Sequence, residues 1–391
     1  MTQARAFRIE VPDSAIQDLH ARLDRSRWPD QIDNADWRYG AEKNYLQQLV
    51  SYWRTTFDWR RAEASINRFD QFLLDVDGLD IHFIHQRSPH PHATPIVITH
   101  GWPGSIVEFL ELIPRLTEPE RFGGRPEDAF HVVCPSLPGF GFSPASPNAG
   151  MHVRVIAGRH HKLMLALGYQ RYMAQGGDWG TPITRSMPEV APEHCQAIHL
   201  NYVSADAPSD AADPTVGLSG KELQALKDFQ VVRADGFGYY HIQSTRPQTL
   251  SYGLNDSPLG LCAWIAEKFH AWSDCDGEIR NAISWDALLT NISLYWFTGT
   301  IGSSTRLYRE NAVAMASGAE PKITRTDVPS GAAIYPREMW RPPKSWVERQ
   351  YRLVHWFEAE KGGHFAAMEQ PQLFAQDLWH FKRTVSTAID N

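Results

Sequence analysis

The sequence predicts an α/β fold: a mostly parallel central sheet flanked by helices, with an inserted helical lid and an amino-terminal helical arm. Short, continuous apolar runs at 95–99 and 130–134, separated by a helical segment near 106–116, predict the sheet. Continuous apolar strands that alternate with helices are typical of a parallel sheet buried on both faces. From 206 to about 330 the strand signals disappear and aromatic-rich helical stretches replace them, which predicts the lid.

The composition is that of an ordinary folded protein. The 391 residues include 38 Lys and Arg against 45 Asp and Glu, a net charge of −7, which disfavours nucleic-acid binding because phosphate contacts need a basic surface. A hydrophobic content of 42% and a charged content of 21% lie far from the signature of disorder. The sequence does not decide whether the chain forms a homo-oligomer.

Segments that target or cross membranes are not expected in this chain. No apolar run approaches the ~18 residues that span a bilayer, and the first ten residues lack the apolar core of a signal peptide. We therefore expect a cytoplasmic protein without a membrane anchor. Its four cysteines, Cys134, Cys195, Cys262 and Cys275, are scattered, which favours reduced core thiols over a disulfide framework or a zinc site.

Four parts are expected along the chain: the arm at 1–68, the first part of the core at 69–205, the lid at 206–330 and the second part of the core at 331–391. In the arm, Ser14 is placed to cap a first helix, and a second helix is expected at about 41–55. The sheet begins at 71, where alternating apolar residues and the turn Asp77-Gly78 predict a β-hairpin. Further strands are expected at 172–175, 197–203, 332–335 and 353–358.

The strongest local motif is the run Gly-Gly-Asp-Trp-Gly at 176–180, between a predicted strand and a predicted helix. The pattern small-x-nucleophile-x-small is that of a nucleophile elbow, in which a strained turn lifts one side chain above the sheet. Here that side chain is Asp178. A helix-capping Asp in a Gly-rich turn explains the same run, and the run alone does not separate the two interpretations.

Two further runs occur in the order that the elbow requires. His-Gly-Trp-Pro-Gly at 100–104 follows a strand, where an α/β-hydrolase supplies one N–H of its oxyanion hole, so Trp102 and Trp179 are the expected donors. Gly-Gly-His-Phe at 362–365 follows the last predicted strand, where the histidine of the catalytic triad belongs, which indicates His364.

The acid of the triad is expected at Glu338, just past the strand predicted at 332–335. Asp206, past the preceding strand, is the competing choice. Asp327 is placed before its strand and so at the wrong end of the sheet. The His-rich loop 85–92 lacks accompanying carboxylate or Cys ligands, which favours a solvated loop over a metal site. Neither a metal nor an organic cofactor is expected for the chain.

Together these motifs make the chain resemble epoxide hydrolases of the microsomal type, which have the α/β-hydrolase fold. The resemblance covers nearly the whole chain and rests on these runs: Arg-Ser-Arg-Trp-Pro at 25–29, His-Gly-Trp-Pro-Gly-Ser at 100–105, Gly-Gly-Asp-Trp-Gly at 176–180, Gly-Tyr-Tyr-His-Ile-Gln at 238–243, Tyr-Trp-Phe-Thr-Gly-Thr at 295–300, Arg-Leu-Tyr-Arg-Glu-Asn at 306–311 and Gly-Gly-His-Phe-Ala-Ala-Met-Glu at 362–369. Mammalian members carry an amino-terminal membrane anchor, which we do not expect here.

The resemblance implies that each of two lid segments donates one tyrosine. By position in the motifs these are Tyr239 and Tyr308, with Tyr240 as the neighbour that is easily confused with Tyr239. Phenols stay protonated at pH 7 and are far more acidic than an alcohol, so two of them suit the binding and protonation of an epoxide oxygen. The lid residues Trp264, Trp272 and Trp296 are expected to pack the lid or to line an apolar pocket, and none is assigned to the site.

An aspartate nucleophile suits epoxide opening. A serine would leave an ether on the enzyme, whereas Asp178 leaves an ester that water can open. A carboxylate is already ionised at pH 7, which frees His364, oriented by Glu338, to activate that water. We therefore expect hydrolysis of a small hydrophobic epoxide to a vicinal diol through a covalent ester.

Two alternatives stay open at this point. A haloalkane dehalogenase shares the aspartate nucleophile but binds a leaving halide through N–H groups, and Trp179 beside the nucleophile fits that activity. A non-catalytic α/β-hydrolase that binds a ligand is the second alternative, although nucleophile, histidine and acid are all present. A serine esterase is disfavoured because no serine stands at the elbow.

Overall fold

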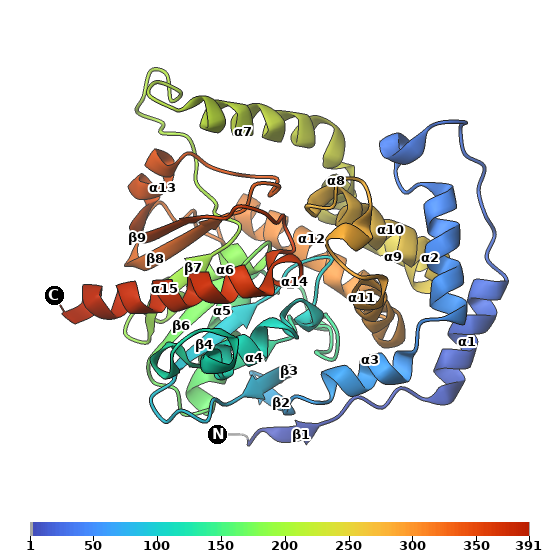
Figure 1. Ribbon diagram of the computed structural model, residues 1–391, viewed down its shortest axis with the longest axis horizontal. Helices are drawn as coiled ribbons and strands as arrows, with labels where there is room; N and C mark the ends of the chain where they lie inside the picture. Colours follow the sequence, from blue (N-terminus) through green and yellow to red (C-terminus); the bar gives the residue numbers. More distant parts are fainter. Residues whose placement is uncertain (1–2, 391) are drawn as a thin grey trace.

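A nine-stranded sheet forms the centre of the computed structural model, which describes residues 3–390 (Figure 1). The strands lie in the order β1-β2-β3-β5-β4-β6-β7-β8-β9. They are β1 (Arg5–Phe7), β2 (Gln71–Val76), β3 (Leu79–Gln86), β4 (Thr94–Thr99), β5 (Phe130–Pro135), β6 (Tyr172–Gly176), β7 (Cys195–Leu200), β8 (Thr326–Ile334) and β9 (Tyr351–Glu358). The neighbouring strands in the part β5-β4-β6-β7-β8-β9 are parallel to one another. The pairs β1·β2, β2·β3 and β3·β5 are antiparallel. The predicted mostly parallel sheet is confirmed.

Helices cover both faces of this sheet. The α-helices are α1 (Asp13–Asp24), α2 (Lys43–Thr55), α3 (Trp59–Ile66), α4 (Leu112–Thr117), α5 (Val153–Ala166), α6 (Gly180–Val190), α7 (Gly220–Val231), α8 (Gly238–Thr245), α9 (Pro247–Asp256), α10 (Pro258–Trp272), α11 (Trp285–Thr298), α12 (Ile301–Ser317), α13 (Lys344–Gln350), α14 (Ala366–Glu369) and α15 (Pro371–Asp390). Along β4, Ile96 and Ile98 face the core beneath α4 and α15, whereas Val97 faces the core that includes α5 and α6. The sheet is therefore buried on both sides, as its continuous apolar strands predict.

Several boundaries differ from the sequence-based expectation. α1 begins at Asp13 instead of after Ser14, because the carbonyl of Pro12 already accepts the N–H of Ala15. The helix expected at 106–116 is split into the 3-10 helix η2 (Ile106–Phe109) and α4. Pro114 explains the break, since a proline inside a continuous helix has no N–H to donate and clashes with the carbonyl four residues earlier.

The strands on either side of the lid also shift. β7 ends at Leu200 instead of 203, and β8 begins at Thr326 instead of 332. Asp327 and Pro329 lie in the first half of β8 and obscure its apolar pattern, because proline and aspartate are depleted in strands. Asp327 therefore lies within the strand and not before it, although still near its amino end.

Between β7 and β8 the chain forms helices only, α7 to α12, at the position expected for the lid. Figure 1 shows α1 and α2 (blue) beside the lid helices α9 and α10 (yellow), at the end of the molecule away from β8 and β9. The Trp53 indole N–H donates to the Ser293 hydroxyl at 3.0 Å, and the Trp285 indole N–H donates to the Tyr45 hydroxyl at 2.8 Å. The arm thus packs against the lid through buried polar contacts.

The described residues also bear on what the sequence predicts for the cysteines, for the His-rich loop, and for membrane-spanning helices and metal sites. All four cysteines are buried and free, as predicted. His85, expected in a solvated loop, instead lies within β3, one residue before its end, and is buried, with its Nε2 2.8 Å from the Tyr169 hydroxyl. Over residues 3–390 no helix is long and apolar enough to cross a membrane, and no group of three or more His, Cys, Asp or Glu side chains is arranged to hold a metal ion.

Candidate active site

The run at 176–180 forms a sharp turn between β6 and α6, with Asp178 at its apex. Asp178 has φ +47°, in the left-handed region that few residues other than glycine adopt and that aspartate tolerates better than most. A Cβ at Gly176 would collide with the carbonyl of Gly180, and one at Gly180 would collide with the carbonyl of Thr99. The turn therefore needs small residues at these two positions, as the elbow interpretation requires.

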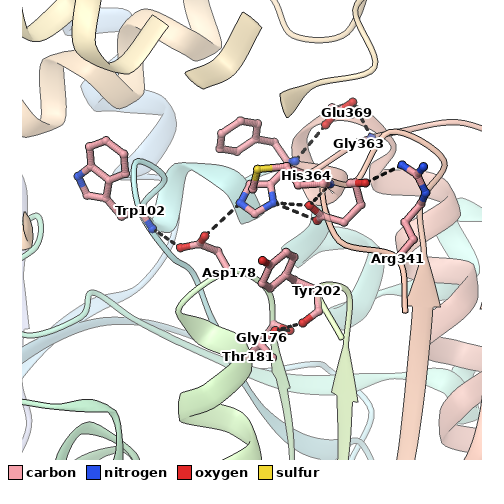
Figure 2. A network of polar contacts seen from close by, with 12 residues as sticks. Trp102, Gly176, Asp178, Thr181, Tyr202, Arg341, Gly363, His364 and Glu369 are labelled. Carbon is pink, nitrogen blue, oxygen red and sulfur yellow. Dashed lines mark hydrogen bonds and ion pairs between the residues drawn. The ribbon is translucent and has the colours of Figure 1, made fainter. Parts of the chain in front are cut away.

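The Asp178 side chain does not cap the helix that follows it. Its Oδ1 accepts the backbone N–H of Trp102 at 2.8 Å, and its Oδ2 lies 3.2 Å from His364 Nε2. Figure 2 shows Asp178 lying between Trp102 and His364. A Cβ at Gly101 would collide with the Asp178 carboxylate, so the loop after β4 approaches the aspartate closely only because it has glycine there.

The loop that carries Trp102 is held by α11. Asn291 Nδ2 donates to the carbonyl of Pro103 at 2.8 Å, and the Tyr295 hydroxyl donates to the carbonyl of Gly104 at 2.7 Å. Of the two expected oxyanion donors, Trp102 thus already points its N–H at Asp178. Trp179 follows Asp178 directly, but within the described residues its N–H makes no hydrogen bond to that carboxylate.

His364 lies in the loop after β9 and joins two carboxylates. Its Nδ1 is 2.8 Å from Glu338 Oε1 and 3.0 Å from Glu338 Oε2, and its Nε2 faces Asp178. The side chains of His364 and Glu338 are only 3% and 2% exposed, so solvent does not screen this pair. Glu338 is fixed in turn by the backbone N–H of Met339, which donates to its Oε1 at 2.7 Å.

The charge on His364 follows from these neighbours. Burial by itself lowers the pKa of the imidazole, but the charges of Glu338 and Asp178 and their hydrogen bonds outweigh burial and raise that pKa well above its ordinary value. The two carboxylates therefore favour the protonated form of the imidazole.

The competing acids do not reach the histidine. The Asp206 side chain is 61% exposed and pairs with Lys322 at 2.8 Å. The Asp327 side chain is 81% exposed and pairs with Arg325 at 2.8 Å. Glu338 is thus the carboxylate, among the three considered from the sequence, that contacts His364.

Glu369 is a buried carboxylate that the sequence analysis did not assign to the site. Its Oε2 accepts the N–H groups of Gly363 and Asp274 at 2.9 and 2.8 Å, and its Oε1 accepts that of Phe365 at 3.0 Å. These bonds hold the backbone on both sides of His364 and tie it to the segment after α10. Burial raises the pKa of Glu369 to about 7, against the effect of the three N–H donors.

Tyr239 from α8 and Tyr308 from α12 lie across a cavity of about 190 Å³ that Asp178 also lines. The Tyr239 ring stacks on Trp102 at 5.4 Å between centroids, and the Tyr308 ring meets Trp179 edge-on at 4.7 Å. The two phenol rings are 6.0 Å apart. The predicted pair therefore converges on the carboxylate from the lid side.

The tyrosine hydroxyls differ in what surrounds them. Within residues 3–390 the buried Tyr308 hydroxyl lies near Tyr239 and Trp179 but makes no hydrogen bond of normal geometry, an arrangement that costs free energy and is uncommon outside functional sites. Burial raises the pKa of Tyr239 and of Tyr308 well above the ordinary value for a phenol, so both stay protonated. Tyr240 lines the same cavity but is only partly buried.

Two more side chains of α10 pack against the site residues and were not assigned from the sequence. The Trp272 ring lies 5.1 Å from the His364 ring and 5.3 Å from the Tyr239 ring, so this tryptophan belongs to the site, whereas Trp264 donates to Gln243. Lys268, nearly buried, places its Nζ 4.5 Å from the centre of the Tyr239 ring. The spacing of Trp272 and Lys268 along the helix is that of ordinary core-facing residues, so no sequence signal marks them as residues of the site.

Comparisons with known proteins identify the family of the chain. Residues 4–109 match the family model described as the epoxide hydrolase N terminus, and residues 94–235 match that of the alpha/beta hydrolase fold. Epoxide hydrolase 1 of Sus scrofa is 40% identical over 96% of this chain and 88% of its own length.

Two solved structures are also similar over nearly the whole chain. The crystal structure of juvenile hormone epoxide hydrolase from the silkworm Bombyx mori has a TM-score of 0.92 at 29% identity and covers 100% of this chain and 96% of its own. The epoxide hydrolase of Aspergillus niger has a TM-score of 0.87 at 32% identity and covers 98% of this chain and 97% of its own. The chain belongs to the epoxide hydrolase family with the α/β-hydrolase fold, and it is a hydrolase that acts on epoxides.

Proposed function

We propose that the chain hydrolyses a hydrophobic epoxide to a vicinal diol through an ester on Asp178. The observation that carries this proposal is the convergence of one carboxylate, one imidazole and two phenols on the same point of the fold. Asp178 lines the cavity with Tyr239 and Tyr308, and the Oδ2 atom of Asp178 lies 3.2 Å from His364 Nε2. No metal or organic cofactor enters the reaction that these groups support.

In the first step, an oxygen of Asp178 attacks an epoxide carbon, and the bond from that carbon to the ring oxygen breaks. The ring oxygen takes up the proton of a phenol, from Tyr239 or Tyr308, so that no free alkoxide is released. The unpartnered hydroxyl of Tyr308 supports this role because a buried donor without an acceptor is ready to bind an incoming oxygen.

In the second step, water opens the ester. Esterification removes the negative charge of Asp178, which is one of the causes that raise the pKa of His364, so the imidazole can release its proton and act as a base. His364 then takes a proton from water as the water oxygen bonds to the Asp178 carbonyl carbon. The Trp102 N–H, with that of Trp179 as the second proposed donor, stabilises the negative charge on the carbonyl oxygen.

The substrate class follows from the wall of the cavity. Phe237, Tyr239, Tyr240, Tyr308 and Met339 give it a mostly apolar lining, which favours a hydrophobic epoxide. The paired phenols favour protonation of an oxygen over binding of a halide, which argues against the dehalogenase alternative. The intact contacts among Asp178, His364 and Glu338 argue against a non-catalytic ligand-binding protein.

The experiment that tests the ester replaces His364→Gln and adds styrene oxide. Ring opening is expected to continue while ester hydrolysis slows by about 10³-fold or more, so that the adduct accumulates on Asp178. Intact-mass spectrometry and peptide mapping detect it, and His92→Gln, at an exposed loop position, serves as the control. An unchanged mass in the His364→Gln protein would contradict the proposal.

A single turnover in oxygen-18 water with excess enzyme gives an independent check. The oxygen that is added to the first molecule of diol is expected to come from the Asp178 carboxylate, so the label should appear in the protein first. Label found at once in the diol and absent from the protein would exclude the covalent route.

A further inference from the structure

A second, much smaller cavity lies against Asp178, separate from the one that the tyrosines line. Its volume is about 10 Å³, which is close to the space that a single water needs. Asp178 and His364 line it together with Glu108 and Asn201. A water in this cavity would thus touch both the group that carries the ester and the base that activates water.

Glu108 lies in η2, just after the loop that carries Trp102. Its carboxylate faces the backbone amides of Gly101 and Ser105. A Cβ at Gly104 would collide with Glu108 Oε1, so the carboxylate fills the space that a side chain at 104 would take. Because residue 104 is a glycine, the Glu108 carboxylate can pack directly against the backbone of the loop that carries Trp102.

We propose that Glu108 is a positioning residue that holds the hydrolytic water in this cavity, between its own carboxylate and His364 Nε2. The inference rests on the proposed function, because it concerns the second step of that reaction. A water has two hydrogens, and His364 can accept only one of them. The Glu108 carboxylate accepts the other, which turns a lone pair of the water oxygen toward the carbonyl carbon of Asp178.

The atoms balance in this scheme. The water proton that faces His364 moves to Nε2 as the water oxygen bonds to the carbonyl carbon. The bond between that carbon and the alkyl oxygen then breaks, and His364 returns its proton to the departing diol. The hydrogen that faces Glu108 stays on the new carboxyl group of Asp178 until that group ionises.

The charges that face Glu108 also change during the reaction. Burial raises the pKa of Glu108 to about 8, and the negative charge of Asp178 adds to the shift, whereas the positive charge of His364 opposes it. Esterification removes the Asp178 charge. His364 gives up its proton at the same stage, so both charges are lost together, and an oxygen of the Glu108 carboxyl group can accept the water hydrogen in either ionisation state.

Two variants test the proposal by different routes. Glu108→Gln removes the charge at constant size. Gly104→Ala keeps Glu108 but places a methyl group where its carboxylate lies, and the fold can absorb this change because the displaced atom ends a flexible side chain. Glu111→Gln, an exposed glutamate three residues further along the chain, is the matched control.

The measurement separates the two steps with styrene oxide as the probe. Rapid quenching followed by intact-mass spectrometry gives the rate of adduct formation and the rate of its loss. In Glu108→Gln and Gly104→Ala we expect adduct formation within about threefold of the wild type and adduct loss slowed by about 10-fold to 100-fold, because the water is misplaced while the base is intact. Glu111→Gln is expected to match the wild type.

Four outcomes would overturn the proposal. Adduct loss at the wild-type rate in both variants would show that Glu108 does not position the water. Equal slowing of both steps would show a general structural role instead. His364→Gln, measured beside these variants, distinguishes a failure of this inference from a failure of the proposed function. An adduct in His364→Gln but none in the Glu108 and Gly104 variants would refute this inference alone. No adduct in any variant would refute the proposed function as well.

Discussion

The sheet side and the lid side of the cavity hold their reacting groups in different ways. On the sheet side, Asp178 and His364 are fixed by hydrogen bonds to backbone and carboxylate groups, at an apex with φ +47°. On the lid side, the Tyr239 ring is placed by stacking on Trp102 and the Tyr308 ring by an edge-on contact with Trp179, and the Tyr308 hydroxyl makes no hydrogen bond of normal geometry among the described residues.

This difference separates two requirements of the reaction. The sheet side must keep a nucleophile and a base at fixed distances through two chemical steps, and directional hydrogen bonds do this well. The lid side must leave its donors free for an oxygen that arrives with the substrate. Packing can hold a phenol ring in place without using its hydroxyl, which explains why the lid contributes aromatic side chains to the site.

The largest expected effect comes from Asp178→Asn on the sheet side. Asparagine also tolerates a positive φ, so the turn should survive while the nucleophile is lost. We expect kcat/KM for styrene oxide to fall by about 10⁴-fold or more, with no adduct in the mass spectrum. Because removal of a nearby negative charge disfavours the imidazolium, the pKa of His364 should also fall, which NMR titration of the imidazole can follow. An unchanged pKa would mean that Asp178 does not control the charge on His364.

The lid side is expected to respond differently to Tyr239→Phe and Tyr308→Phe. Each single change should slow ring opening by about 10-fold to 100-fold, and the double change by about 10³-fold, because one phenol can partly replace the other as the proton donor. Rapid-quench kinetics of adduct formation measures this. Tyr308→Phe should not lower the melting temperature, since it removes a buried hydroxyl without a partner. Wild-type ring opening in the double variant would exclude these phenols as donors.

A matched pair of acidic residues tests the partner of His364. Glu338→Gln should lower the rate of ester hydrolysis by about 10²-fold or more, because the imidazole loses the carboxylate that orients it. Asp206→Asn, at an exposed residue paired with Lys322, should leave kcat within about twofold. A large loss in Asp206→Asn with a small one in Glu338→Gln would reverse the assignment.

The smallest effect on chemistry is expected from Glu369→Gln, which should act mainly on stability. The change replaces one of the two oxygens that accept the three buried N–H groups with an amide NH2, which cannot accept, and should cost about 1 to 3 kcal/mol, measured by urea unfolding against the exposed control Glu360→Gln.

The same variant has a pH signature. The pKa of Glu369 in the folded protein, about 7, lies above the ordinary value of 4.5. The stability that the protonated form contributes is therefore fully present below pH 4.5 and is lost as the pH rises through 7. The cost of Glu369→Gln should accordingly be larger at pH 5 than at pH 8. Equal costs at the two pH values would show that this carboxyl does not titrate in that range.

Much of the sheet side could be predicted from the sequence because its signals are local. Continuous apolar runs mark β4, β5 and β6, and the small residues around Asp178 are needed by the turn itself. His364 and Glu338 follow predicted strands, so chain order alone places them near the elbow. The strand β1 was missed because three residues are too few to show a period.

The remaining residues of the site depend on contacts between segments far apart in the sequence. Glu369 resembles an ordinary helical glutamate until its bond to the N–H of Asp274, 95 residues away, is seen. Glu108 gains its position from the space above Gly104 and from a cavity shared with His364. Nothing in the local pattern of either residue distinguishes a buried carboxylate from a solvated one.

The contacts of the arm with α11 have a consequence for how substrate choice can change. Trp53 binds Ser293, and two residues later along the chain Tyr295 holds the loop of Trp102, on which the Tyr239 ring rests. Residues 3–70 do not line the cavity of the tyrosines. Substitutions in a segment remote from the reacting atoms can therefore reshape the substrate-facing wall while the acid, the base and the nucleophile stay as they are.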